Sequence, residues 1–316
     1  MSVFTLLERA ELEAFVAPYG LGRLLDFQGI AAGTENSNFF VSLEAGEYVL
    51  TLVERGQRAD LPFVVELLQR LHAAGLPVPY GVPTRSGECL RELADKPALL
   101  QPRLAGKHIE QPNAHHCAEV GSWLARMHLC TQAQPLERRS DRGLDWMLSE
   151  GPLQALQLDG EALELLRASL AEVAQAQAAV LALPRANLHA DLFRDNVLFD
   201  GPHLSGVIDF YNACSGPMLY DVAITLNDWC STASGSLDLS RARALLAAYA
   251  SLRPFHPAEA ERWPCMLRIA CLRFWLSRLI AARQPTALGV QIKDPDEFRQ
   301  LLLQRQQVLL PLPLAL

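Results

Sequence analysis

The sequence predicts an α+β protein made of a small antiparallel sheet followed by a mostly helical region. Three observations predict it. Short apolar segments joined by turns are concentrated in the first third of the 316-residue chain. Beyond Gly106 the apolar residues recur mainly at helical spacing, apart from one hairpin pattern at 188–210. The chain is also about twice the length of a typical domain, which favours two parts.

The first part reads as a sheet that carries one inserted helix. Thr5 precedes Glu8 by three residues, the spacing of a capping box at the start of a helix. A turn is predicted at 44–47 and another at 85–88, while Gly75 is predicted to end the inserted helix. The predicted elements are a helix at 5–17, strands at 39–43 and 48–53, a helix at 61–74 and a strand pair near 80–101.

The second part is predicted to be helical except for a hairpin at 188–210. In that segment two short apolar strands flank an Asp-Gly turn at 200–201. We therefore expect an N-terminal lobe of residues 1–102 and a C-terminal lobe of residues 103–316. The predicted helices of the second lobe lie near 113–129, 161–182, 239–251, 258–284 and 294–309.

Composition excludes several classes of protein and partner. The net charge is −7, so neither nucleic acid nor an anionic membrane is expected to bind. The seven cysteines are spread singly without a CxxC pair, which argues against a disulfide framework or a zinc site and is typical of reduced thiols in the cytoplasm. No apolar run reaches the roughly 20 residues that a membrane-spanning helix needs.

The hairpin predicts a site for a hard cation. If its turn is centred between residues 202 and 203, Asn196 and Asp209 lie opposite each other at its open end. Asp191 lies on the loop that leads into the first strand. Amide and carboxylate oxygens suit Mg²⁺, which usually takes the rest of its ligands from water and substrate phosphates.

The spacing His-x-Asp-x-x-x-x-Asn at 189–196, followed by Ile-Asp-Phe at 208–210, resembles the catalytic signature of kinases. Its form is similar to that of the aminoglycoside-phosphotransferase and choline-kinase branch. The resemblance implies a protein-kinase-like bilobal fold in which Asp191 accepts or orients the proton of the substrate hydroxyl. It further implies that Asn196 and Asp209 hold Mg²⁺ on ATP. His189 and Asp221 would be structural braces of the catalytic loop.

A glycine-led polar turn before the second expected strand is a candidate nucleotide site. Its candidate residues are Gly33, Asn36, Ser37 and Asn38, whose backbone N–H groups and side chains can face phosphates. Where most kinases carry a lysine on the next strand, this chain has Thr51, and its first lysine is Lys96.

The missing lysine changes what is expected of the neighbouring residues. Glu66 then loses its expected ion-pair partner, and phosphate charge would be met by Mg²⁺, backbone amides and an arginine such as Arg55. By the same resemblance, residues 98–102 form the inter-lobe hinge, with Leu99 and Gln101 beside the nucleotide.

Several segments together resemble the homoserine kinases of this kinase-like type. They lie at 33–41, 48–52, 61–63, 75–79, 189–199, 220–230 and 272–279. The resemblance implies ATP-dependent phosphorylation of the side-chain hydroxyl of L-homoserine to O-phospho-L-homoserine, on the route to threonine.

An amino-acid substrate needs an anionic partner for its ammonium group and a donor for its carboxylate. Asp228 and Asp209 are candidates for the first role. The donor candidates are arginines, because a guanidinium can bind a carboxylate in bidentate fashion. Packing or ion pairing within the protein is the competing interpretation of these side chains. The remaining candidate substrate-binding residues are Arg194, Tyr211, Arg273 and Arg278.

Three other functions remain open at this stage. The chain could be another small-molecule kinase that acts on an aminoglycoside, choline, a sugar or methylthioribose. It could be an inactive nucleotide-binding module, as the missing lysine suggests, although retention of Asp191, Asn196 and Asp209 argues against this. It could also be a regulatory or scaffold protein that binds no nucleotide.

Overall fold

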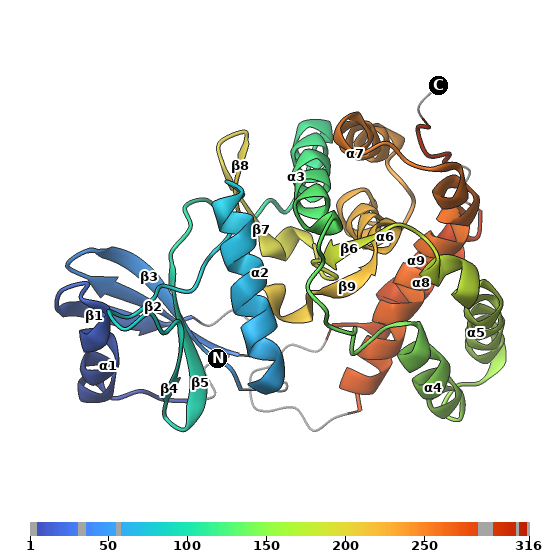
Figure 1. Cartoon of the computed structure of the whole chain (residues 1–316). Coiled ribbons are helices and arrows are strands. Elements are labelled where there is room, and N and C mark those ends of the chain that lie inside the picture. The colour runs from blue at the N-terminus through green and yellow to red at the C-terminus, as the bar shows by residue number, and fades with distance from the viewer. Residues whose placement is uncertain (1–4, 31–35, 55–57, 284–292, 308–309, 315–316) are drawn as a thin grey trace. The chain divides into compact units, whose positions relative to one another are not determined.

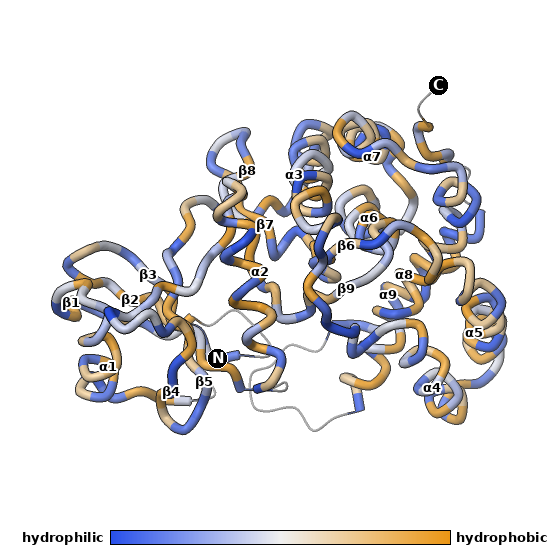
Figure 2. The backbone as a smooth tube through the Cα atoms, in the orientation of Figure 1, coloured by the Kyte–Doolittle hydropathy of each residue, from blue (hydrophilic) through white to orange (hydrophobic). Residues whose placement is uncertain are grey.

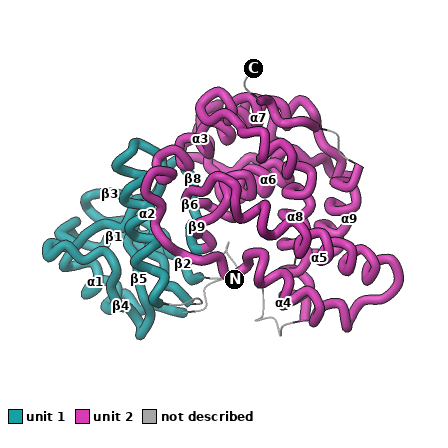
Figure 3. The backbone as a smooth tube through the Cα atoms, turned by 45° about the vertical axis from the view of Figure 1, so that its right-hand side comes forward, with its two compact units in different colours: residues 1–105, 206–211, 285–291 teal, residues 106–205, 212–284, 292–316 magenta. Residues whose placement is uncertain are grey.

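The computed structural model describes residues 5–30, 36–54, 58–283, 293–307 and 310–314 (Figure 1). The chain forms two compact units (Figure 3). Unit 1 contains the chain up to Ala105 together with Gly206–Tyr211, and unit 2 contains Gly106–Ser205 and most of the chain after Asn212.

Unit 1 is built on a five-stranded antiparallel sheet with the strand order β1-β2-β3-β5-β4. Its elements are α1 (Arg9–Val16), β1 (Leu24–Gly29), β2 (Ser37–Leu43), β3 (Gly46–Leu52), α2 (Leu61–Ala73), β4 (Leu90–Leu93) and β5 (Lys96–Pro102), with short 3₁₀ turns at Ala17–Tyr19 and Arg58–Asp60. The predicted strands near 39–43 and 48–53 and the predicted helix near 61–74 are confirmed.

Alternation of side chains builds the core of unit 1. Along β2 every second residue from Ser37 to Leu43 is buried, as expected for a strand with one face in the core. The inserted helix α2 is amphipathic, so hydrophobic and hydrophilic colours alternate along it in Figure 2. Its buried residues are Leu61, Val64, Leu67, Leu68 and Leu71.

Two local predictions for unit 1 are wrong. The first helix begins at Arg9, and its capping box joins Glu8 to Glu11 rather than Thr5 to Glu8. The turn between the last two strands lies at Ala94 and Asp95, both with positive φ, and not at 85–88. Residues 85–88 do form a turn, but it precedes β4. A turn without glycine carries a weaker sequence signal than the Ser-Gly pair at 86–87.

Unit 2 is mainly helical, as predicted. Its helices are α3 (Ala114–Gln132), α4 (Leu144–Ala155), α5 (Gly160–Leu181), α6 (Met218–Trp229), α7 (Leu239–Leu252), α8 (Pro257–Ala281) and α9 (Pro295–Arg305). Its strands are β6 (Arg185–Leu188) with β9 (Cys214–Pro217), and β7 (Val197–Asp200) with β8 (His203–Val207), whose last residues belong to unit 1. The predicted hairpin at 188–210 is therefore present as β7 and β8.

The elements that were not predicted have weak sequence patterns. Helix α6 is buried along almost its whole length, so it lacks the polar stripe by which a surface helix is recognised. Helix α4 contains Pro152, a residue that usually argues against a helix interior. The strands β6 and β9 have four residues each and pair over a separation of about 30 residues. No helix in the described part of the chain is long and apolar enough to cross a membrane.

Candidate active site

The loop between β6 and β7 is held by a buried carboxylate of α6. The backbone N–H groups of His189 and Ala190 donate to the two carboxylate oxygens of Asp221 at 2.7 and 2.8 Å. Ala190 has φ of 61°, a conformation that costs about 1–2 kcal/mol for a residue with a Cβ atom. The Asp221 carboxylate also lies 3.2 Å from Nε2 of His128, whose Nδ1 lies 2.8 Å from the hydroxyl of Tyr249. A buried polar network therefore fixes the strained start of the loop.

The far end of α6 anchors the same loop again. The indole N–H of Trp229 donates to the carbonyl oxygen of Leu192 at 3.1 Å. The carboxylate of Asp228 accepts from the backbone N–H of Arg194 at 2.8 Å and from its guanidinium Nε at 3.1 Å. Helix α6 lies beside β6 and β9 (Figure 1). Both ends of the loop are therefore held by hydrogen bonds to one helix.

Asp191 occupies the middle of this loop, and its carboxylate has a fixed direction. The carboxylate accepts from Nδ2 of Asn212 at 3.2 Å. The backbone carbonyl oxygen of Asp191 accepts from the backbone N–H of Phe193 and from Nδ2 of Asn196, both at 2.8 Å. Because the amide nitrogen of buried Asn196 makes this bond, its amide oxygen faces the other way and is a suitable ligand for a cation.

A buried arginine faces the same carboxylate through Asn212. Arg273 on α8 is buried and lies with its guanidinium 3.9 Å from the ring centre of Phe274. Its Nη2 donates to Oδ1 of Asn212 at 3.5 Å, so Arg273, Asn212 and Asp191 form a chain. Burial raises the pKa of the Asp191 carboxyl above its ordinary value, and the charge of Arg273 opposes this shift. A carboxylate in this environment has a stronger tendency to take up a proton than one in water.

Asp209 follows β8 and belongs to the segment assigned to unit 1. It is exposed, and its φ of 65° is a conformation rare for residues other than glycine. Strained backbone of this kind is concentrated at functional sites. Asn196 stands directly before β7 and Asp209 two residues after β8, so the two residues border the predicted hairpin. Their direct opposition remains a prediction.

The amide oxygen of Asn196 and the carboxylate of Asp209 are of the kind that Mg²⁺ binds, and a shared cation site remains a prediction. The described residues contain no cluster of three or more His, Cys, Asp or Glu side chains that could hold a metal ion. One amide oxygen and one carboxylate leave most of the coordination shell open, which is the usual situation for Mg²⁺ bound together with a nucleotide.

The predicted nucleotide residues lie at the start of β2 and on its neighbours. Gly33 and Arg55 lie outside the described residues. Oδ1 of Asn36 accepts from the backbone N–H of Glu54 at 3.2 Å, and the hydroxyl of Ser37 donates to the Glu54 carboxylate at 2.5 Å. Both residues are thus tied to the chain that follows β3.

Near the end of β3, Thr51 carries a hydroxyl where the kinase pattern has a lysine. The hydroxyl of Thr51 donates to Oδ1 of Asn38 at 2.7 Å, and Thr51 also hydrogen-bonds with Tyr211. Burial raises the pKa of the Tyr211 hydroxyl, so it is neutral. The structure therefore places Tyr211 beside the nucleotide residues of unit 1. Leu99 and Gln101 are buried on β5, opposite Thr51 and Val49.

The structure separates the expected substrate-binding residues. Arg194 and Asp228 form an ion pair with each other, and their expected roles toward the substrate carboxylate and ammonium group remain predictions. Arg278 donates to the backbone carbonyl of Asp294 at 2.9 Å and to Glu297 at 2.5 Å, where it ties α8 to α9. Among the candidate arginines, Arg273 is linked to the Asp191 carboxylate by hydrogen bonds through Asn212.

Two polar side chains near Asp191 were not predicted. Asn212 had no signal, because an asparagine three residues after Asp209 matches no motif considered above. The hydroxyl of Tyr220 is buried without a hydrogen-bond partner in the described part of the chain. Its electrostatic neighbours include Arg273 and Asp191. Tyr220 directly precedes Asp221, so its position could have been inferred from the brace.

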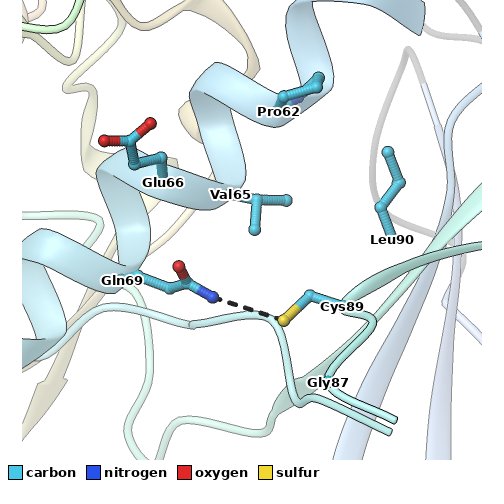
Figure 4. Close-up of a pocket in the computed structure, with 7 residues that line it drawn as sticks. All are labelled: Pro62, Val65, Glu66, Gln69, Gly87, Cys89 and Leu90. Carbon is cyan, nitrogen blue, oxygen red and sulfur yellow. Dashed lines mark hydrogen bonds between the residues drawn. The ribbon is translucent and has the colours of Figure 1, made fainter.

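A separate concavity of about 460 Å³ lies on unit 1 (Figure 4). Nε2 of Gln69 lies 3.4 Å from the sulfur of Cys89, whose thiol pKa is raised by burial. None of the predicted site residues in the described part of the chain lines this concavity. Its lining residues are Pro62, Val65, Glu66, Gln69, Gly87, Cys89 and Leu90.

Comparison with known proteins agrees with this geometry. Residues 26–255 match the model of the phosphotransferase enzyme family. A homoserine kinase of Pseudomonas aeruginosa (strain UCBPP-PA14) is 67% identical over the full length of both chains. A homoserine kinase of Methylobacillus flagellatus is 43% identical, with 96% of this chain and 94% of the relative covered. The chain belongs to the homoserine kinases of the phosphotransferase family.

Solved structures of distant relatives share the fold. The structure of a microcompartment-associated aminopropanol kinase has a TM-score of 0.70 at 17% identity, with 95% of this chain and 94% of the other covered. The amicoumacin kinase hAmiN, solved with AMP-PNP and Ca²⁺, has a TM-score of 0.69 at 16% identity, with 95% and 92% covered. The predicted kinase-like α+β fold is confirmed, and the chain is a phosphotransferase with an alcohol acceptor.

Proposed function

We propose that the chain transfers the γ-phosphoryl group of ATP to the side-chain hydroxyl of L-homoserine and produces O-phospho-L-homoserine for threonine biosynthesis. The observation that carries this proposal is the loop of Asp191, which α6 holds at both ends, in a chain that is 67% identical to a homoserine kinase. In phosphoryl transfer the protein mainly positions the reactants and neutralises charge, and a rigid loop serves this purpose.

Asp191 is proposed to accept the hydrogen bond of the substrate hydroxyl and to orient its oxygen toward the γ-phosphorus. The carboxylate already takes one hydrogen bond from Asn212, which leaves its second oxygen for the alcohol. Its raised pKa makes it a better proton acceptor than an ordinary aspartate when the hydroxyl proton is released.

Asn196 and Asp209 are proposed to hold Mg²⁺ with ATP. The ion, when bound, neutralises phosphate charge and orients the γ-phosphoryl group. The side-chain bond from Asn196 to the Asp191 carbonyl fixes which of its two amide atoms faces the ion. This ties the direction of the metal ligand to the loop that carries the proposed base.

Arg273 is proposed to bind the carboxylate of homoserine, with the hydroxyl of Tyr220 as a second donor. Arg273 is buried and contacts Asn212, which hydrogen-bonds with the Asp191 carboxylate, and a guanidinium can bind a carboxylate in bidentate fashion. The hydroxyl of Tyr220 is buried without a hydrogen-bond partner in the described residues and would gain one from the substrate. Asn36, Ser37 and Asn38 are proposed to face the ATP phosphates.

A cytoplasmic location is part of the proposal. All seven cysteines lie in the described part of the chain, and each is a free thiol. Reduced cysteines are typical of a reducing compartment.

The function is tested by a coupled assay of ADP release with different acceptors. L-Homoserine should give kcat/KM at least about a hundredfold higher than L-serine, choline, kanamycin or methylthioribose, because a site built for a zwitterion of fixed length rejects analogues that leave its polar groups unpaired. Release of ADP with every acceptor at the rate seen without acceptor would contradict the proposal. A preference for kanamycin or choline would assign the chain to another kinase of the same fold.

A further inference from the structure

Unit 1 lacks the ion pair that the kinase resemblance leads one to expect. Thr51 stands where that pattern has a lysine, and its hydroxyl is bound to Asn38. Glu66 of α2, the expected acidic partner, instead contacts Arg70 one helical turn further on. The side chains of Arg70 and Glu66 are 38% and 52% exposed, so solvent screens the pair and it has little energetic weight.

A different lysine makes a better-protected ion pair in the same unit. Lys96 is the first residue of β5, and its ammonium group contacts the carboxylate of Glu54, just after β3. The Glu54 side chain is only 8% exposed and that of Lys96 33%. The Lys96 ammonium group also donates to the hydroxyl of Thr5 at 2.7 Å. A partly buried pair of this kind is screened much less by solvent than one on the surface.

Glu54 connects this lysine to Asn36 and Ser37 at the start of β2. Its carboxylate accepts from the hydroxyls of Ser37 at 2.5 Å and Thr5 at 2.7 Å, and its backbone N–H donates to Oδ1 of Asn36 at 3.2 Å. Burial acts to raise the pKa of Glu54, but hydrogen bonds from Lys96, Ser37 and Thr5 outweigh it, so the pKa lies below its ordinary value. The carboxylate is therefore ionised and can hold all three donors.

Removing Lys96 would leave a buried carboxylate without its counter-charge. A buried charge in that position is costly, and the group would be expected to take up a proton or to move toward solvent. Either change weakens the hold on Ser37, because a protonated or displaced carboxylate is a poorer acceptor. The positions of Asn36 and Ser37 thus depend on a residue about 60 positions later in the chain.

We propose that the Lys96–Glu54 pair positions Asn36 and Ser37 at the start of β2 for nucleotide binding and takes the place of the missing strand lysine. It rests on the proposed function, in which Asn36 and Ser37 face the phosphates of ATP. Lys96 is a positioning residue here, because it acts on Asn36 and Ser37 through Glu54 and not by contact with the reacting atoms.

The test is equilibrium binding of a non-hydrolysable ATP analogue with Mg²⁺ to the wild type and to Lys96→Met, Lys96→Arg, Glu54→Gln and the double variant Lys96→Met/Glu54→Gln. Lys96→Met should weaken binding about tenfold or more, the effect of losing a hydrogen bond to a charged group. Lys96→Arg should restore most of the affinity. The double variant should bind the analogue about as well as the single variant with the lower affinity. The effects of two substitutions are not additive when both residues act through one contact.

Steady-state kinetics separate positioning from general damage to the fold. The KM for ATP should rise in Lys96→Met, because Lys96 acts on Asn36 and Ser37 in the same unit. The KM for homoserine should stay within about twofold. The control is Arg58→Met, which breaks the exposed ion pair between Arg58 and Glu92 in the same unit and should change nothing.

Two results would overturn the proposal. One is unchanged affinity for the analogue in Lys96→Met. The other is an equal loss of affinity for both substrates together with a lowered melting temperature and no rescue by arginine, which would make the pair a general structural contact. Because analogue binding needs no acceptor, failure of homoserine to react in the wild type would refute the proposed function and leave this test decisive.

Discussion

Replacing Asp191 by asparagine should lower kcat for homoserine phosphorylation by a factor of about 10²–10⁴, the range that loss of a general base usually causes. Asparagine preserves the size of the side chain and can still pair with Asn212, but it cannot take the proton of the alcohol. Affinity for ATP should stay within about twofold, because the change removes an interaction made in the transition state. Steady-state kinetics with varied ATP and homoserine give both values.

The matched control is Asp195→Asn on the same loop. Asp195 is exposed, and its carboxylate contacts Lys293 at 3.1 Å, an ion pair of low expected weight. Its activity should equal that of the wild type within about twofold. Wild-type turnover in Asp191→Asn would remove Asp191 from the mechanism.

The pH profile offers an independent check of the same assignment. Burial raises the pKa of Asp191, so the active carboxylate form should be lost at a higher pH than an ordinary aspartate would be. As pH falls, kcat/KM of the wild type should therefore decline along a limb displaced toward neutral pH. In Asp191→Asn the remaining activity should lack this limb.

Replacing Asp209 by asparagine should reduce turnover by at least about a hundredfold at ordinary Mg²⁺ concentrations, since the change removes the charged ligand of the proposed metal site. Part of the activity should return at high Mg²⁺ or with Mn²⁺, because an amide oxygen is a weaker ligand and not an absent one. Titration of activity against each metal measures the effect.

The control for this variant is Asp200→Asn on the turn of the same hairpin, where the residue is exposed. It should leave the dependence on Mg²⁺ unchanged. A dependence that is also unchanged in Asp209→Asn would mean that Asp209 does not bind the metal.

The sequence predicted the elements with strong periodicity and failed where tertiary contacts decide. Helix α2 has apolar residues at helical spacing and strand β2 is a short apolar segment before a turn, and both appear where they were expected. Helix α6 is buried on nearly all sides and carries no such pattern. Only the structure reveals that this helix holds the loop that contains Asp191.

The part of the candidate site that could be proposed from the sequence is the part that forms a compact motif. Asp191, Asn196 and Asp209 stand at fixed spacing around one hairpin, so the sequence singles them out, and their roles remain predictions. Arginines were much harder to assign, because a guanidinium serves equally well in an ion pair with its own chain. Arg194 and Arg278 proved to have such partners, whereas Arg273 contacts Asn212 beside the proposed base.

Contacts between distant parts of the sequence could not be predicted. The pair of Lys96 and Glu54 joins the start of β5 to the end of β3, and Ser37 and Thr5 complete it. No local pattern links residues so far apart. The absence of the strand lysine was visible in the sequence, whereas the ion pair that we propose as its replacement could be found only in the fold.

The account rests on phosphoryl transfer to the side-chain oxygen of homoserine. The most direct test is ³¹P NMR of a reaction that contains the purified chain, ATP, Mg²⁺ and L-homoserine. We expect a new phosphomonoester signal split by the adjacent methylene protons, absent without homoserine and lost with Asp191→Asn. Consumption of ATP that yields only inorganic phosphate, or no new signal while another alcohol is phosphorylated, would contradict the account.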